Sequence, residues 1–234
     1  MKSRLTEPEK LDDLSLQGET LHKALQSLAW INRWFGNHRS VIKAIHAVYK
    51  KQERPLRIID LGCGGGDLIS AVARSLQQQQ IEFSITGIDG NPDSLAYAQK
   101  QSAMFGNIDF IQADILSKNF SIQSCDILIS SHFIYHFQEE KLASFLKNNE
   151  SVVSTAIIFS ELERNGLAWR LFKFSSFLLP ISKMAKTDGL LAIQRSFTRK
   201  EWISILQKAG ISGYRLQAVP LFRILLTIFP GKKI

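Results

Sequence analysis

The chain has 234 residues, which is long enough to bury a large hydrophobic core without disulfide or metal staples. Hydrophobic residues make up 45% of it and charged residues 21%, which excludes a disordered, collagen-like or coiled-coil chain as a whole. The formal net charge is +8, which favours acidic partners such as nucleic acid, anionic lipid or phosphate-bearing ligands without choosing among them.

Cysteine spacing and hydropathy limit where the protein works. Cys63 and Cys125 form no CxxC pair and no His/Cys cluster at zinc spacing, so we expect a reducing, cytoplasmic location and no metal. The charged N-terminus, MKSRLTEPEK, lacks the apolar core of a signal peptide. The apolar stretches are shorter than the about 20 residues of a membrane span, so none is predicted.

Short apolar runs alternate with helical stretches from residue 56 onward. Strands are predicted at 56–61, 83–88, 107–112, 126–130 and 152–159, and helices at 67–79, 92–105 and 139–147. Strands separated by helical crossovers form a parallel sheet covered on both faces. The C-terminal part adds a helix at 198–209 and two runs, 214–219 and 221–229, which Pro220 joins in a tight antiparallel reversal.

Two segments lie outside this alternation. We predict that residues 1–50 form an N-terminal helical cap on a single domain, 51–234, and that 161–197 form a helical lid inserted after the fifth strand. The aromatic stretch 167–177 in this insertion fits a substrate lid, a membrane-surface helix or a dimer face.

A glycine-rich loop, DLGCGGGD at 60–67, follows the first predicted strand. Glycines let the backbone turn sharply and let a ligand touch main-chain atoms. A nicotinamide-type G-x-G-x-x-G pattern starting at Gly62 would end at Asp67, whose carboxylate would face the pyrophosphate. The observed G-x-G-x-G therefore favours a ligand without pyrophosphate and disfavours a nicotinamide-dependent oxidoreductase.

Two acidic residues end the next two strands. Asp89 is placed to accept hydrogen bonds from both ribose hydroxyls of an adenosine, and Asp114 to reach the exocyclic amino group of adenine. The structural alternative for Asp89 is a simple turn residue, and the alternative for Asp114 is a helix cap. The loop and both acids, in order and at strand ends, form a constellation far more specific than the loop alone.

The segment from 56 to 160 resembles the class I methyltransferases that use S-adenosylmethionine (SAM). The resemblance implies a Rossmann-like α/β fold: a seven-stranded, mostly parallel sheet with an antiparallel last strand, flanked here by the N-terminal helices and the insertion. It places the glycines beneath the methionine part of SAM, the first acid on the ribose and the second on the adenine. The implied cofactor-binding residues are Asp60, Gly62, Gly64, Gly66, Asp89, Asp114, Ile115, Ser130 and Arg33.

The flanking sequences are similar to a narrower group. LAWINRWFG, ELERNGLAWRLFK and DGLLAIQRSFTRKEW resemble small bacterial methyltransferases of the polyketide and quinone-biosynthesis type. That resemblance implies a phenolic or polyketide acceptor.

The predicted fourth strand ends in SSHFIYH, at 130–136, where the fold opens onto the transferred methyl group. His136 and His132 are the candidate bases, since histidine abstracts protons near neutral pH, with structural packing as the alternative. The candidate substrate-binding residues are Tyr135, Glu161, Arg164 and Trp34, against a solvated helix start or simple core packing.

We therefore predict a SAM-dependent methyltransferase that methylates the oxygen of a lipophilic phenolic, polyketide- or quinone-like molecule and releases S-adenosylhomocysteine. It would be a monomer or homodimer, and peripheral membrane contact stays open. An RNA-directed methyltransferase fits the net charge, but the (Asn/Asp)-Pro-Pro-(Tyr/Phe) turn of amino-directed nucleic-acid enzymes is replaced by Ser130-Ser131-His132-Phe133. A non-catalytic SAM-binding or membrane-surface protein is the third alternative.

Overall fold

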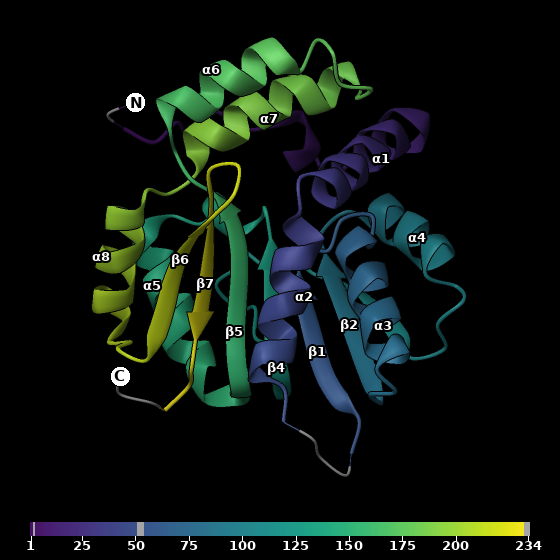
Figure 1. The fold of residues 1–234 in the computed structure, drawn as a ribbon, viewed down its shortest axis with the longest axis vertical. Coiled ribbons are helices and arrows are strands. Elements are labelled where there is room, and N and C mark those ends of the chain that lie inside the picture. The colour runs from purple at the N-terminus through teal and green to yellow at the C-terminus, as the bar shows by residue number, and fades with distance from the viewer. Residues whose placement is uncertain (2, 51–53, 232–234) are drawn as a thin grey trace.

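The computed structural model describes residues 1, 3–50 and 54–231. Its seven-stranded sheet has the order β3-β2-β1-β4-β5-β7-β6 (Figure 1). The strands are β1 Leu56–Leu61, β2 Phe83–Asp89, β3 Ile108–Gln112, β4 Cys125–Ser131, β5 Val153–Leu162, β6 Tyr214–Val219 and β7 Arg223–Ile228. Strands β1 to β5 pair in parallel, whereas β7 runs antiparallel to its neighbours β5 and β6. The predicted mostly parallel sheet with an antiparallel last strand is confirmed.

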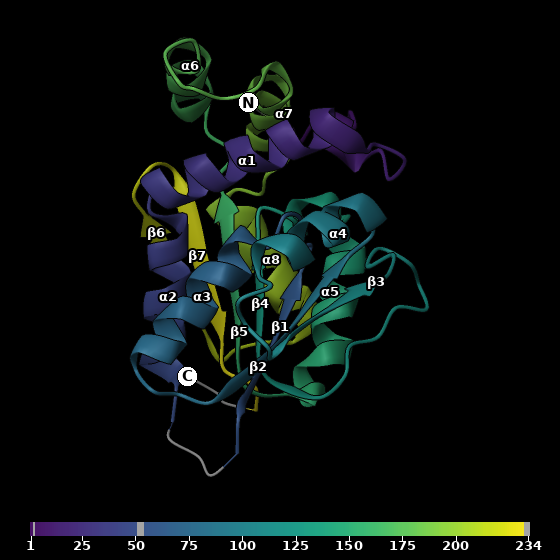
Figure 2. The same cartoon turned by 90° about the vertical axis from the view of Figure 1, so that its right-hand side faces the viewer.

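Helices cover both faces of the sheet and the edge where the parallel strands end. They are α1 Gly18–Trp34, α2 Asn37–Val48, α3 Asp67–Gln78, α4 Pro92–Gln101, α5 Glu139–Asn149, α6 Gly166–Ser175, α7 Lys183–Arg195 and α8 Arg199–Ala209, with 3-10 turns at Lys10–Asp12, Ile134–His136 and Glu150–Val152. Figures 1 and 2 show α2, α3 and α4 towards one face, α5 and α8 on the other, and α1, α6 and α7 above the carboxyl ends.

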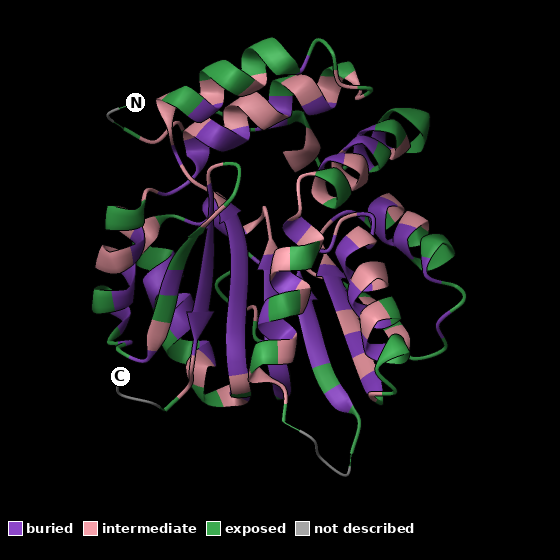
Figure 3. Ribbon diagram, viewed as in Figure 1, coloured by how far each residue is buried: buried purple, intermediate pink, exposed green. Residues whose placement is uncertain are grey.

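Burial follows this layering, because a central strand is covered on both faces. All six residues of β7 and the first six of β4 are buried (Figure 3). One face packs around α5 and α8, where Trp202 is fully buried, and the other around α2 and α3, where Val41 and Ile69 are fully buried. Two hydrophobic cores thus hold the sheet rigidly beneath its carboxyl edge.

Most elements differ from the sequence prediction by one to three residues at one or both ends, and β5 runs to Leu162, two residues into the predicted insertion. Two differences have a clear structural reason. The helix predicted at 92–105 ends at Gln101, because the backbone of Ser102 leaves the helical region, with φ of −104° and ψ of 7°, and the chain turns. Phe105 is buried beyond that turn and continues the apolar pattern without continuing the helix. The final strand begins at Arg223, because Leu221 and Phe222 have φ of 63° and 55° and form the reversal after Pro220.

The cover over the carboxyl edge combines distant parts of the chain. Near the N-terminus, the Leu5 amide donates to the Gln194 carbonyl, and the Gly18 amide donates to the Asp93 carboxylate at 2.7 Å. After β5, the segment predicted as an insertion carries α6 and α7. The domain boundary predicted at residue 51 and the end at 234 lie outside the described residues. No described helix is both long and apolar enough to cross a bilayer.

Candidate active site

A cavity of about 490 Å³ lies between the cover and the carboxyl ends of the strands. Strand order reverses between β1 and β4, and open α/β sheets bind ligands at this switch point. The lining runs from the glycine loop and the end of β2 to α6 and α7, and it is largely aliphatic and aromatic, including Leu21, Leu25, Leu28, Ile31, Phe172 and Ile193. Its size and character suit a small organic ligand.

Two of the three predicted glycines face the cavity. Gly62 and Gly64 line it with φ of 67° and 49°, in the left-handed region that only glycine adopts easily. A Cβ on Gly62 would lie 2.3 Å from Cγ of Phe133, so the ring also requires glycine there. Gly66 lies outside the lining and brings the start of α3 against Ala98 of α4.

Asp89 anchors this loop to the end of β2. Its Oδ2 accepts a hydrogen bond from the Gly64 amide and its Oδ1 one from the Asn91 amide, both at 2.9 Å. Burial raises the pKa of Asp89. Each carboxylate oxygen has capacity for a further donor, and Asp89 lines the cavity. The donor–acceptor chemistry therefore fits a pair of ribose hydroxyls.

The residues after β3 complete this end of the cavity. Asp114 and buried Ile115 both line it, and Asp114 Oδ1 accepts from the Leu116 amide at 3.0 Å. Leu14, from the N-terminal segment, approaches Gly90 on the opposite side and also contributes to the lining. Apolar walls with an acceptor carboxylate fit an adenine ring and its amino group.

Seven predicted site residues lie outside the lining: Gly66, Asp60, Ser130, Arg33, Trp34, Glu161 and Arg164. Buried Asp60 stands near Asp67 and Asp89, and desolvation, helped by their charges, raises its pKa well above the usual range. The Ser130 hydroxyl donates to the Leu61 carbonyl at 2.8 Å, which ties β4 to β1. Arg33 and Trp34, at the end of α1, are both exposed.

Asp67, which argued against a pyrophosphate ligand, is held by the N-terminal helices. Its Oδ2 lies 2.7 Å from Nε2 of His38 and accepts from Asn32 at 3.0 Å. These contacts join the start of α3 to α1 and α2. The carboxylate therefore supports the cap and the glycine loop together.

Two further candidates, Glu161 near the end of β5 and Arg164 just after it, lie outside the cavity lining. Glu161 is buried, and its Oε1 accepts from the Phe133 and Ile134 amides at 3.1 and 3.0 Å. Burial raises the pKa of Glu161 to about 8. Arg164 turns away from the cavity and donates to Glu201 of α8 at 2.6 Å. Glu161 thus positions the turn that carries the candidate bases.

His132 lines the cavity at the end of β4. It has φ of 56°, and its amide donates to the Ser160 carbonyl at 3.2 Å. Burial lowers its pKa to about 3, and the charge of nearby Arg223 acts in the same direction. The side chain is therefore neutral near pH 7, and its buried Nε2 has no hydrogen-bond partner among the described residues.

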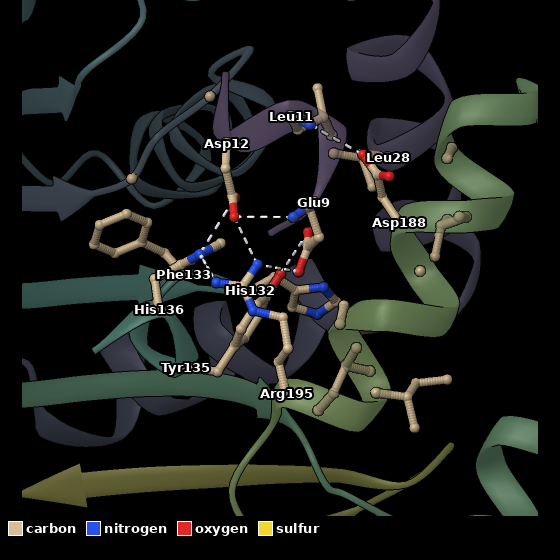
Figure 4. Close-up of a pocket in the computed structure, with 18 of the residues that line it drawn as sticks. Glu9, Leu11, Asp12, Leu28, His132, Phe133, Tyr135, His136, Asp188 and Arg195 are labelled. Carbon is tan, nitrogen blue, oxygen red and sulfur yellow. Dashed lines mark hydrogen bonds and ion pairs between the residues drawn. The ribbon is translucent and has the colours of Figure 1, made fainter. Parts of the chain in front are cut away.

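A polar cluster of Glu9, Asp12, Tyr135, His136 and Arg195 forms the other end of the cavity (Figure 4). Arg195 Nη1 donates to Glu9 Oε1 at 3.2 Å and to Asp12 Oδ2 at 2.6 Å, while the Tyr135 hydroxyl donates to Glu9 Oε2 at 3.1 Å. Burial raises the pKa of Glu9 to about 8. The guanidinium thus donates to both carboxyl groups and balances the charge of Asp12.

His136 can adopt either of two hydrogen-bonding states in this cluster. Its Nδ1 lies 3.0 Å from Nη2 of Arg195 and 3.3 Å from Oδ1 of Asp12. Facing Arg195, Nδ1 accepts and Nε2 carries the proton; facing Asp12, Nδ1 donates and Nε2 is free to accept one. Burial lowers the pKa of His136 to about 4, so the ring is neutral near pH 7.

Among the lining residues that sequence reasoning missed are the charged side chains of Glu9, Asp12, Asp188 and Arg195. The first two belong to the N-terminal segment, read only as a polar start. The other two are the first and last residues of DGLLAIQR, which was noted for family resemblance alone. Asp188 Oδ2 accepts from the Leu11 amide at 3.1 Å, while its buried Oδ1 has no partner in the described part of the chain.

A family model described as a methyltransferase domain matches residues 52–210, well over half of the chain. The chain belongs to this family. A ubiquinone/menaquinone biosynthesis C-methyltransferase of Campylobacter jejuni is 28% identical over 184 residues, covering 74% of this chain and 76% of the relative. A carboxy-S-adenosyl-L-methionine synthase of Helicobacter pylori is 33% identical over 97 residues, 41% of this chain and 39% of that protein.

Solved methyltransferase structures share the fold. Human N-acetylserotonin methyltransferase in complex with SAM aligns with a TM-score of 0.61 and 16% identity over 97% of this chain and 64% of that longer chain. Magnesium protoporphyrin IX methyltransferase from Synechocystis, with bound SAH, aligns with a TM-score of 0.59 and 16% identity over 93% and 90% of the two chains. The methyltransferase is thus a class I, SAM-dependent enzyme, as the glycine loop and the sheet indicated.

Proposed function

We propose that this enzyme transfers a methyl group from SAM to an oxygen of a lipophilic small molecule of the phenolic, polyketide or quinone type. One observation carries the proposal: the apolar cavity is continuous from the glycine loop to the polar cluster around His136. An apolar acceptor with a hydroxyl would fill such a space and place its polar atom at the cluster. The relative named for quinone biosynthesis supports this acceptor class.

The residues at the β1–β3 ends fit the cofactor. In the proposal, Asp89 holds the ribose, the main chain at Gly62 and Gly64 contacts the methionine part, and Asp114 with Ile115 bounds the adenine. SAM supplies an electrophilic methyl group on a good leaving group, so the protein must chiefly align the acceptor and exclude water. The apolar lining and the cover meet both requirements.

His136 is proposed as the base and Arg195 as the group that stabilises the developing phenolate. With Nδ1–H directed at Asp12, the neutral imidazole has Nε2 free to take the acceptor's proton; burial lowers the pKa of the ring, and the Asp12 charge acts against this lowering. In this state Nδ1 no longer accepts from Arg195, so the guanidinium can donate to the acceptor oxygen and stabilise its developing negative charge. Deprotonation matters because an un-ionised phenol is a poor nucleophile.

A small acceptor is favoured over RNA by the charges in the cavity. Its lining contains two cationic side chains, and each already bonds to the protein: Arg195 in the polar cluster and Arg223 through Nη1, which donates to the Phe35 carbonyl at 2.9 Å. Phosphates bind through available lysines and arginines. We further propose a cytoplasmic location, supported by the free buried thiols of Cys63 and Cys125.

The test uses SAM with a labelled methyl group, a fractionated host lysate, and matched phenol, phenol methyl ether and quinone acceptors. Label in the organic extract, lost when the hydroxyl is blocked, supports oxygen methylation of a lipophilic acceptor. Label retained with the methyl ether would move the reaction to carbon, and label in RNA would overturn the small-molecule proposal.

His136→Ala tests the base. We expect unchanged SAM affinity by calorimetry and a fall in kcat of about a hundredfold or more, the usual contribution of a general base. The matched control is His132→Ala, which removes the other cavity histidine and should reduce kcat less. Wild-type kcat in His136→Ala would restrict this residue to packing.

A further inference from the structure

The outer face of α6 is apolar and has no cover in the described structure. Leu167, Leu171 and Phe174 recur at helical spacing on one side, and Phe177 and Leu178 follow the helix end. Phe174, Phe177 and Leu178 are 72%, 77% and 89% exposed. We call these five residues the α6 patch. Figures 1 and 2 show α6 as the outermost element, above α7 and away from the sheet.

The inner face of α6 is already used. Ala168 is buried, and the Phe172 ring lies 2.7 Å from the position that a Cβ on Gly189 of α7 would occupy. Packing of α6 on α7 therefore does not need the α6 patch. Exposed contiguous apolar surface of this kind marks an interaction site more often than chance exposure.

The segment around the patch is exclusively cationic. Residues 166–187 contain Arg170, Lys173, Lys183 and Lys186 and no aspartate or glutamate. Arg170, Lys173 and Lys183 are exposed, and Lys173 Nζ lies 4.9 Å from the centroid of the Trp169 ring. Aromatic and aliphatic side chains flanked by lysines and arginines are the combination by which interfacial helices bind membranes.

We propose that the α6 patch docks on the surface of an anionic lipid bilayer. Cations beside an apolar stripe gain from anionic headgroups while the stripe enters the acyl boundary. A second copy of this chain fits less well. A two-fold interface pairs the same surface with itself, so it would bring these cations together without an acidic partner from the same segment.

The surface is continuous with the active-site cavity. Leu171 belongs to the α6 patch and also lines the cavity. Phe172 and Ser175 of the same helix, which are not part of the patch, line the cavity as well. Docking would therefore place the substrate end of the cavity at the bilayer, where lipophilic molecules partition. This delivery route rests on the proposed function, whereas docking itself does not.

Flotation with vesicles tests the docking. The full-length protein is mixed with phosphatidylcholine vesicles alone or with added phosphatidylglycerol. We expect binding that requires the anionic lipid and falls at high salt. Arg170→Gln/Lys173→Gln should weaken the partition coefficient about fivefold per charge, since each cation near such a surface contributes about 1 kcal/mol. Phe174→Ser/Phe177→Ser should weaken it at least about tenfold, as buried aromatic surface is lost.

Matched controls lie on other elements. Lys141→Gln/Lys147→Gln removes two exposed charges from α5, and Met104→Ser removes a 71% exposed apolar side chain after α4; both should bind as wild type. SAM affinity by calorimetry and phenol methylation are measured for the patch variants without vesicles. These two readouts test the proposed function independently of docking. The proposal would be overturned if the wild-type protein did not bind anionic vesicles, or if the patch variants bound these vesicles as well as the wild type. So would a dimer in sedimentation that Phe174→Ser/Phe177→Ser dissociates.

Discussion

The two ends of the cavity are built by different means. At the proposed cofactor end, the glycines and acids that meet lie between 62 and 114, and Asp89 reaches a loop only 25 positions away, at Gly64. At the proposed acceptor end, Arg195 joins Glu9 across 186 positions and Asp188 joins Leu11 across 177. The first depends on backbone conformation after strands, and the second on buried charges brought together by tertiary packing. The two ends should therefore fail in different ways.

Removing the guanidinium should have the largest effect, because it holds the acceptor end together. Arg195→Ala leaves the Asp12 carboxylate without its counter-charge and the buried Glu9 and His136 without a hydrogen-bond donor, which should cost about 3 kcal/mol of folding stability. Urea unfolding measures the change, with the exposed Arg199→Ala as control. Equal stability of the two variants would show that the polar cluster contributes little to the closed cover.

The cofactor end should respond to backbone substitution. Gly62 and Gly36 both have positive φ, at 67° and 76°, but only Gly62 has a side chain, Phe133, where the new Cβ would lie. Gly36→Ala should cost about 1 kcal/mol from conformation alone, and Gly62→Ala about 1–3 kcal/mol more from overpacking. Thermal unfolding compares them. If the two variants lost similar amounts of folding stability, the Phe133 ring would be able to move away from the loop without cost.

Ligand binding separates the ends further. Asp89→Ala should weaken SAM at least about tenfold, about 1.4 kcal/mol, since it removes the proposed ribose contact and the anchor of Gly64. Asp109→Ala, an exposed residue of the neighbouring β3, is the calorimetric control. Unchanged affinity in a folded Asp89→Ala protein would remove the ribose assignment.

The smallest effect concerns the turn that joins the two ends. Glu161 has a pKa of about 8 in the fold against 4.5 unfolded, so between these values the folded state binds more protons and stability falls as pH rises. Glu161→Gln keeps an oxygen for the Phe133 and Ile134 amides but does not titrate. Between about pH 6 and 7, the free energy of unfolding of the wild type should fall by about 1 kcal/mol more than that of the variant. Urea unfolding at each pH measures this difference. If the unfolding free energies of the wild type and Glu161→Gln changed with pH in parallel, Glu161 would not be protonated in the folded state.

Histidine burial acts in the opposite direction. The folded pKa values of about 3 for His132 and about 4 for His136 lie below the usual 6.5, so these side chains destabilise the fold as pH falls through that range. The acid side of the stability curve therefore reports the histidines, and the neutral side reports the buried glutamates.

How far the sequence predicted each end follows from the range of the contacts. The β1 strand, its glycine loop and the acids at the carboxyl ends of β2 and β3 were predicted because each feature is local: positive φ favours glycine, and a parallel strand delivers its last residue to the carboxyl edge. Arg164 and Trp34 were also local guesses, but Arg164 pairs with Glu201 on another helix and Trp34 faces solvent. The positions of these two side chains depend on tertiary contacts that the neighbouring sequence does not specify.

The sequence by itself determined the class of fold and which residues meet at the proposed cofactor end, since strand periodicity, glycine conformation and strand-end carboxylates act within a few residues of one another. Only the tertiary structure decided the acceptor end. Glu9, Asp12, His136 and Arg195 become a cluster because the N-terminal segment crosses the carboxyl edge and meets α7 there. Burial then neutralises the imidazole and favours the protonated form of Glu9, which no sequence position encodes alone.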